Sequence, residues 1–193
     1  MKSKLSVEQL FADLISQSNK HSGILPPIHL WHPEKTGDMD LRIDREGRWF
    51  HESVQIKRPA MVKLFSSLLK LEAGDYYLVS PQEKWRIEVD IAPFYIIDTQ
   101  RVTREGIQVI SFKTSTDECI LLGRDNQLII DTSRSDEPIM PLVNVRDNLM
   151  GLLSRSVYYQ LIDWAQAKPQ LDDRSQLIID SLGCQFPLGD FPE

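Results

Sequence analysis

Residues 84–91, KWRIEVDI, alternate between charged and apolar side chains from the first position to the last. In an extended chain, successive side chains point to opposite sides. One side of this segment therefore carries the apolar residues Trp85, Ile87, Val89 and Ile91. Such a period indicates a strand of an antiparallel sheet that is buried on one face and solvated on the other. The chain must therefore form at least one half-buried sheet.

The remaining apolar pattern divides into short runs and longer helical repeats. Short runs between polar turns predict strands at 41–44, 49–56, 76–80, 107–112, 119–123 and 127–131. Gly47 lies between the first two runs, where hairpin turns often require a positive φ. Apolar residues at helical spacing predict helices at 6–19, 59–69, 146–167 and 175–183. Because the strands are grouped and do not alternate with helices, we predict an α+β fold with mainly antiparallel sheets.

Composition limits the class of protein and its partners. Of 193 residues, 41% are hydrophobic and 26% are charged, which is ordinary for a globular protein. The chain has two cysteines without C-x-x-C spacing, no signal peptide and no apolar run long enough for a membrane helix. These features predict a soluble cytoplasmic protein with no membrane partner. Residues 97–193 carry 9 Lys and Arg against 15 Asp and Glu, so we expect no nucleic-acid partner.

Two segments of the chain resemble each other. VQIKRPAMVKLFSS (54–67) aligns with VNVRDNLMGLLSRS (143–156), and LRID (41–44) aligns with LIID (128–131). Both copies fit a strand, a hairpin, a strand and a helix. We therefore predict two lobes built from a repeated strand-hairpin-helix motif, at residues 1–78 and 79–193. The groove between two such lobes is a natural place for a ligand.

Aromatic and imidazole side chains are concentrated in HLWH (29–32) and GRWFHES (47–53). Three of the four histidines and two of the four tryptophans lie there. Histidines with the nearby aspartates could bind a divalent metal, but no H-E-x-x-H or thiolate pair completes a ligand set. We therefore predict no metal and no cofactor. A second hypothesis is an enzyme in which His51 is the general acid or base, oriented by Asp44 across the hairpin and with or without metal.

The third hypothesis is a ligand-binding wall. Trp49 and His51 fall on one face of the predicted strand, close to cations at the start of the next helix, where a carboxylate or phosphate can bind. The predicted ligand-binding residues are Trp31, Trp49, His51, Lys57, Arg58, Glu83 and Lys84. We therefore predict a non-enzymatic binding or regulatory protein that takes a small anionic ligand or a protein partner. The structural alternative is that the tryptophans and His51 only fill a core.

Several motifs together resemble one known family. They are HLWHP, GRWFHESVQIKR, LFSSLL, SPQEKW, APF at 92–94 and RDNLMGLLSRSVYY. Together they resemble a family of bacterial proteins called domain-of-unknown-function family 1285, over nearly the whole chain. The resemblance implies a two-part α+β fold with a repeated motif and a regulatory or signal-transduction role. It implies no reaction, no ligand and no catalytic residue.

Overall fold

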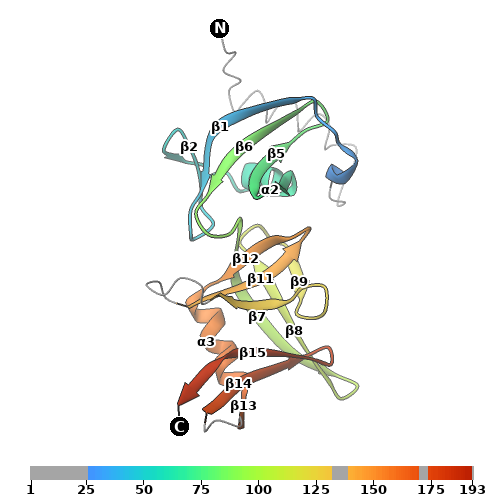
Figure 1. The fold of residues 1–193 in the computed structure, drawn as a ribbon, viewed down its shortest axis with the longest axis vertical. Coiled ribbons are helices and arrows are strands. Elements are labelled where there is room, and N and C mark those ends of the chain that lie inside the picture. The colour runs from blue at the N-terminus through green and yellow to red at the C-terminus, as the bar shows by residue number, and fades with distance from the viewer. Residues whose placement is uncertain (1–25, 132–138, 170–173, 193) are drawn as a thin grey trace. The chain divides into compact units, whose positions relative to one another are not determined.

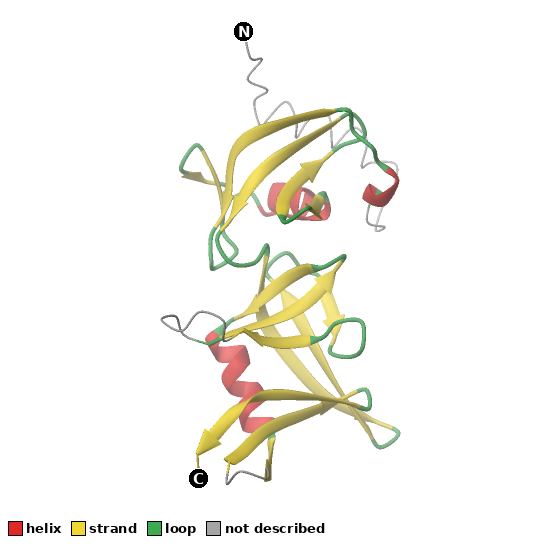
Figure 2. Ribbon diagram, viewed as in Figure 1, coloured by secondary structure: helices red, strands yellow, loops and turns green. Residues whose placement is uncertain are grey.

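A computed structural model of the protein describes residues 26–131, 139–169 and 174–192 (Figure 1). The chain divides into two compact units, which we call unit 1 and unit 2. Unit 1 consists of residues up to Asp44 and of Arg48–Asp90, and unit 2 consists of Arg45–Gly47 and the chain from Ile91 onward. Figure 2 shows that strands predominate in both units. The α+β prediction is therefore correct only in part, because the described chain is mainly β with few helices.

Unit 1 contains one six-stranded sheet, sheet A. Its elements are η1 (Ile28–Leu30), β1 (Lys35–Ile43), β2 (Trp49–His51), β3 (Val54–Gln55), α2 (Pro59–Ser67), β4 (Leu69–Glu72), β5 (Asp75–Val79) and β6 (Glu83–Val89). The strand order in space is β3-β2-β1-β6-β5-β4. All neighbouring strands are antiparallel except β1 and β6, which are parallel.

The alternating segment is β6, and its two faces differ as predicted. Ile87 is buried, whereas Arg86 and Glu88 are exposed. The predicted antiparallel pairing holds on the side of β5, but the other neighbour, β1, is parallel. Alternation of side chains indicates only which face of a strand is buried. It does not indicate whether the neighbouring strands run parallel or antiparallel to it.

The buried face of sheet A carries the unit's core. The predicted helix at 59–69 is confirmed over Pro59–Ser67, with proline in the first turn, where its missing N–H costs little. The Phe65 side chain of this helix is fully buried, and its ring lies 6.1 Å from the ring of Trp49 on β2. Helix and sheet therefore meet around Trp49.

The predicted strand at 49–56 is interrupted. Glu52 and Ser53 have positive φ angles of 47° and 66°, and they form the turn between β2 and β3. Gly47, with a φ of 71°, adopts the predicted left-handed conformation between β1 and β2. The hairpin of two strands that we predicted is therefore a set of three antiparallel strands, β1, β2 and β3.

Ion pairs join β1 to its parallel neighbour β6. The Arg86 Nε lies 2.8 Å from an Asp38 carboxylate oxygen, and Lys35 Nζ lies 3.5 Å from Glu83. At the far end, the Arg42 guanidinium donates two hydrogen bonds, of 2.8 and 2.6 Å, to the Asp90 carboxylate just beyond β6. Charged residues of the two strands are therefore arranged in complementary pairs.

Unit 2 contains two sheets. Its elements are β7 (Phe94–Arg104), β8 (Ile107–Thr114), β9 (Cys119–Leu121), β10 (Leu128–Asp131), β11 (Met140–Arg146), β12 (Leu149–Leu153), α3 (Arg155–Trp164), β13 (Gln166–Pro169), β14 (Arg174–Ser181) and β15 (Cys184–Pro192). Sheet B has the order β10-β11-β12-β7-β8-β9, and sheet C has the order β13-β14-β15.

Sheets A and B have the same topology. In each, the first three strands form one meander and the last three form another, and the first and sixth strands pair in parallel at the centre. The helices differ in position, because α2 connects the two meanders of sheet A whereas α3 follows the second meander of sheet B. The repeat that we predicted aligns β3 and α2 with the β11–β12 hairpin. These segments occupy different places in the two sheets, so that alignment is not confirmed.

The predicted helix at 146–167 is wrong over its first half. Asp147 and Asn148 have positive φ angles of 46° and 61° and form a tight turn between β11 and β12. Asp and Asn tolerate this conformation, which two-residue hairpins require. The helix begins only at Arg155, and its N-cap is Ser154, whose side chain accepts a hydrogen bond from the Val157 N–H.

The predicted helix at 175–183 is also wrong, because these residues form β14 and the turn after it. Gly183 adopts a left-handed conformation, with a φ of 73°, but the turn leads into β15 and does not end a helix. The predicted helix at 6–19 lies outside the described residues. The predicted boundary after residue 78 differs from the observed one, because β6 pairs with β1 and β5 and so belongs to unit 1. In the described ranges, no helix is both long and apolar enough to span a membrane.

Candidate functional site

The first residue of the predicted aromatic wall, Trp49, lies in the core of unit 1. Its side chain is only 1% exposed and packs against Phe65. The half-buried His51 follows on the same face of β2, where it is paired with Leu41 on β1. Trp49 is therefore part of the packed core of unit 1, which favours the structural alternative for this residue.

The predicted pair between His51 and Asp44 does not form. The β1–β2 register places His51 opposite Leu41, so Asp44 lies beyond the paired residues. The buried carboxylate of Asp44 instead accepts hydrogen bonds from the Arg48 backbone N–H, at 2.8 Å, and from Arg48 Nε, at 2.6 Å. An imidazole without this carboxylate lacks the orienting partner that we proposed for acid–base chemistry.

The other predicted residues are distributed over several parts of unit 1. Trp31 is half-buried and follows η1, whereas Lys57 and Arg58 are exposed before α2. Glu83 and Lys84 open β6. Neither of the two grooves described below is lined by any of the seven predicted residues. Across the described part of the chain, no three His, Cys, Asp or Glu side chains are grouped as metal ligands.

Lys84 has a structural partner. Its Nζ donates a 2.7 Å hydrogen bond to the Glu72 carboxylate and lies 4.9 Å from the centre of the Tyr77 ring. This hydrogen bond lowers the pKa of Glu72, aided by Lys70, and raises the pKa of Lys84. The pair therefore connects β4 and β6 across the strand between them, β5.

We expect the Lys84→Met variant to lose stability in a pH-dependent manner. Because folding lowers the pKa of Glu72 from its ordinary 4.5, the stabilisation is present above that value and is lost as the pH falls through the folded pKa. Both side chains reach solvent, so the melting temperature should fall by only about 2 °C at pH 7. The difference from wild type should be smaller at pH 3 than at pH 7 in melting curves followed by circular dichroism. Lys57→Met, which removes an exposed cation of the same unit, is the control. An equal loss at both pH values would contradict the assignment.

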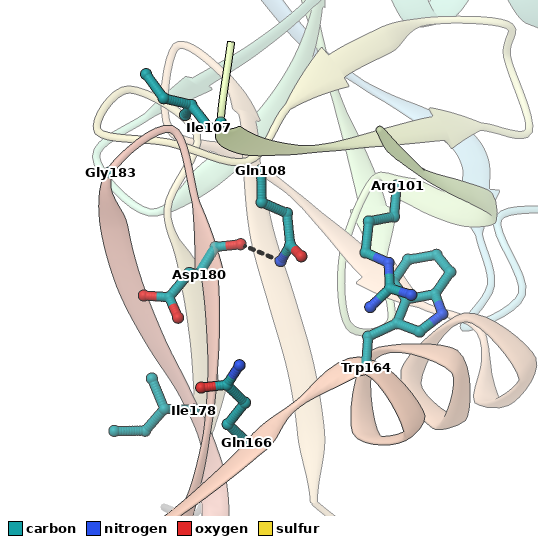
Figure 3. A pocket seen from close by; sticks show the side chains of 9 residues that line it. Arg101, Ile107, Gln108, Trp164, Gln166, Ile178, Asp180 and Gly183 are labelled. Carbon is teal, nitrogen blue, oxygen red and sulfur yellow. Dashed lines mark hydrogen bonds between the residues drawn. The ribbon is translucent and has the colours of Figure 1, made fainter. Parts of the chain in front are cut away.

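A groove of about 400 Å³ lies within unit 2, between β7, β8, the end of α3 and sheet C (Figure 3). Its lining includes Arg101, Gln108, Trp164, Gln166, Ile178 and Asp180. Ligand sites in proteins have volumes of roughly 300 to 1,000 Å³. The groove is therefore large enough for a small metabolite.

Arg101 and Trp164 form one wall of this groove. Val157, Leu161 and Trp164 lie at helical spacing on α3, and the first two are buried against the unit's core. Trp164 is the last residue of α3 and is half-buried. Arg101 lies opposite the fully buried Ile110 on β8. Its guanidinium carbon lies 4.9 Å from the centre of the Trp164 ring.

Gln108 and Asp180 lie on the other side of the groove (Figure 3). The Gln108 amide nitrogen donates a 2.6 Å hydrogen bond to the Asp180 backbone carbonyl. The Asp180 carboxylate accepts a 2.9 Å hydrogen bond from the Gln185 side chain. In addition, the Leu182 N–H donates to the Gln108 backbone carbonyl at 2.9 Å. These bonds attach β14 to β8 and hold both groove residues in place.

Arg101 has no carboxylate partner among the residues that the structure describes. A cation–π contact with an indole does not use up the five N–H donors of the guanidinium. Arginine donors in this arrangement bind carboxylates and phosphates, with two parallel hydrogen bonds where the geometry allows. The groove can therefore hold a small anion beside Trp164. None of its residues was predicted as a ligand contact, since Arg101 and Trp164 are brought together only by the packing of α3 on sheet B.

A second groove, of about 570 Å³, lies on unit 1 at the charged ends of β1, β5 and β6. Its arginine, Arg86, is bound to Asp38, and its Asp90 is bound to Arg42. The charge of each of these side chains is already compensated by its partner within the protein. This groove therefore offers no cation for an anionic ligand.

Comparisons with known proteins agree with the division into two units. Residues 26–92 match the model of the domain of unknown function DUF1285, N-terminal domain, and residues 93–188 match the C-terminal domain of the same proteins. The match between the two models changes at residues 92 and 93, close to the unit boundary at Asp90. Among curated proteins, none matches the chain.

Two solved structures resemble the chain. A DUF1285 family protein from Silicibacter pomeroyi DSS-3 is 36% identical, with a TM-score of 0.78, over 90% of this chain and 93% of that one. A DUF1285 family protein from Shewanella baltica OS155 is 23% identical, with a TM-score of 0.52, over 65% of this chain and 91% of that one. The second likeness concerns the fold alone. Both domains of the family match this chain in order, and the protein from Silicibacter pomeroyi is 36% identical over most of its length. The chain therefore belongs to the DUF1285 family.

Proposed function

We propose that this protein is a non-enzymatic binding or regulatory module, and that it takes a small anionic ligand in the groove beside Trp164. The observation that carries the proposal is Arg101, whose guanidinium lies over the Trp164 ring and has no carboxylate partner in the described chain. A cytoplasmic location and a role in signal transduction, which follow from the sequence and from the family resemblance, are part of the same proposal.

The surroundings of Arg101 support a binding site more than a structural contact. A purely structural arginine is usually paired with a carboxylate, as Arg42 is with Asp90 and Arg48 is with Asp44. The Trp164 ring orients the Arg101 side chain before any ligand arrives, which reduces the entropy lost on binding. Asp44 is bound to Arg48 and does not orient His51, which favours binding over acid–base catalysis at the sequence-predicted cluster. Binding at that cluster and at a groove between the lobes stays a prediction.

Thermal shift and calorimetry with the Arg101→Gln variant test the proposal. The probes are acetate, pyruvate, succinate, inorganic phosphate and the common L-amino acids. We expect at least one probe to stabilise the wild type, and the variant to bind it about 10- to 100-fold more weakly because charge-assisted hydrogen bonds are lost.

The matched control is Arg104→Gln, which removes an arginine from the end of the same strand, outside the groove lining. This variant should bind the probe as tightly as wild type. The proposal fails if no probe stabilises the wild type, or if Arg101→Gln and Arg104→Gln bind equally well.

A further inference from the structure

Two polar side chains reach the groove beside Trp164 from neighbouring strands. Arg101 lies on β7 and Gln108 lies on β8, and both line the groove. In the register of these strands, Arg101 is opposite Ile110, which is two residues from Gln108 and on the same face. We infer that the ligand is a small hydroxycarboxylate, whose carboxylate binds Arg101 and whose hydroxyl donates a hydrogen bond to the side-chain oxygen of Gln108. This inference rests on the proposed function.

The side-chain amide of Gln108 has a fixed orientation. The backbone carbonyl oxygen of Asp180 only accepts hydrogen bonds, so the amide atom that lies 2.6 Å from it must be the nitrogen. The amide oxygen therefore lies on the opposite side, which faces Arg101 (Figure 3). This oxygen has no partner in the described part of the chain. Because an amide oxygen only accepts, the ligand must bring a hydrogen-bond donor to it.

The donor on the ligand is expected to be neutral. Asp180 is the one carboxylate among the described residues that line the groove. Its side chain points away from Gln108 and accepts a hydrogen bond from Gln185 on β15 (Figure 3). An ammonium group next to Gln108 would thus lose its hydration without gaining an opposite charge, which is costly. A hydroxyl group supplies the same donor without a charge.

The other side of the groove favours a single negative charge. Arg101 is the one cation in the described lining. Its guanidinium lies over Trp164, the last residue of α3, and the C-terminal end of a helix carries a partial negative charge. The second charge of a dianion such as phosphate would find no partner there. A monocarboxylate matches this side better.

The positions of the two side chains limit the length of the ligand. Diagonal neighbours on paired antiparallel strands are roughly 7–8 Å apart, and Arg101 and Gln108 are related in this way. The groove volume of about 400 Å³ is near the lower limit for small-molecule sites. A hydroxyl close to the carboxylate, as in 2-hydroxy and 3-hydroxy acids, fits both dimensions.

Matched probes on the full chain test the inference by calorimetry. Lactate is compared with propionate, which lacks the hydroxyl, and 3-hydroxybutyrate is compared with butyrate in the same way. We expect at least one hydroxy acid to bind the wild type about 5- to 10-fold more tightly than its deoxy relative, because one hydrogen bond is gained. Pyruvate has an oxo group that only accepts hydrogen bonds, so it should bind no more tightly than propionate.

Variants assign the preference to Gln108. Gln108→Met removes the acceptor, so it should bind the hydroxy acid and its deoxy relative equally. The matched control is Gln185→Met, which removes the other side-chain hydrogen bond at Asp180 from outside the lining. This control should keep the wild-type preference. Arg101→Gln should bind both probes weakly, because it loses the contact with the carboxylate.

The outcomes separate this inference from the proposed function. Equal binding of hydroxy acids and deoxy relatives by the wild type would overturn the hydroxyl contact and leave the anion site intact. Loss of the preference in Gln185→Met as well as in Gln108→Met would assign it to the attachment of β14 and also overturn the contact. If Gln108→Met does not fold, the comparison on the wild type decides alone. Failure of every carboxylate to bind would overturn the proposed function too.

Discussion

Replacing Trp49 with alanine should lower the free energy of unfolding by about 3–5 kcal/mol, because a large aromatic side chain is lost from a packed core. Trp49 is 1% exposed, packs against Phe65 and lies opposite the fully buried Ile43 of β1. Since whole domains are stable by about 5–15 kcal/mol, this loss is a large fraction of the total, and the midpoint of unfolding should fall clearly. Urea denaturation followed by circular dichroism measures the change.

Trp31→Ala is the matched control, because Trp31 belongs to the same sequence cluster but is only half-buried and lies outside the sheet. It should cost clearly less than Trp49→Ala. If Trp49→Ala instead folded with wild-type stability and lost binding of a ligand, Trp49 would be part of a site and not of the core.

Replacing Ser181 with alanine should destabilise unit 2 by about 3 kcal/mol, although only one oxygen atom is removed. The Ser181 side chain is fully buried. Its hydroxyl accepts a 3.0 Å hydrogen bond from the Ile110 N–H and donates a 2.7 Å hydrogen bond to the Leu122 carbonyl. Alanine leaves both backbone groups buried without a partner, and each such group costs about 1–3 kcal/mol. Urea denaturation measures this loss too.

Ser67→Ala serves as the comparison for Ser181. The Ser67 hydroxyl donates only to the Leu64 carbonyl of its own helix, so its loss should change stability by less than about 1 kcal/mol. Ser181 also joins β14 to β8 beside the groove. Equal effects of the two substitutions would mean that water or a backbone shift satisfies the groups that Ser181 now binds.

Local patterns in the chain predicted the elements whose signal depends on near neighbours. The alternation of residues 84–91 indicated β6 and its buried face, and the apolar spacing after Pro59 indicated α2. Two strands were predicted on either side of Gly47; the first is part of the longer β1, and the second is divided by a turn into β2 and β3. In each case the period of the side chains is a property of a single element.

Other segments were misread because their patterns fit two structures. LMGLL (149–153) and QLII (176–179) are short, apolar and without a clear period, and such runs do not distinguish a buried strand from part of a helix. Residues 149–153 form β12 because β11 and β7 lie on either side of them. Residues 176–179 belong to β14, which pairs with β13 and β15. For β12, the partner β7 is distant in the sequence, whereas β11 directly precedes it. For β14, the partners β13 and β15 are its neighbours in chain order.

The candidate site could not be predicted from short segments either, because its residues are distant along the chain. The sequence contains one dense cluster of tryptophan and histidine, yet burial of Trp49 makes part of that cluster core. The groove residues Arg101 and Trp164 belong to different predicted elements, and neither is near a recognisable motif. Their contact exists only because α3 packs across the end of β7.

By itself, the sequence determined the family, the presence of half-buried sheets, the helix α2 and the faces that β6 buries. These depend on side-chain period and on motif identity, which neighbouring residues specify. The tertiary structure alone decided the parallel pairs β1–β6 and β7–β12, the boundary near Asp90 and the meeting of Arg101 with Trp164. Each of these joins residues that are distant along the chain, and their proximity results from strand pairing and packing, which no short segment encodes.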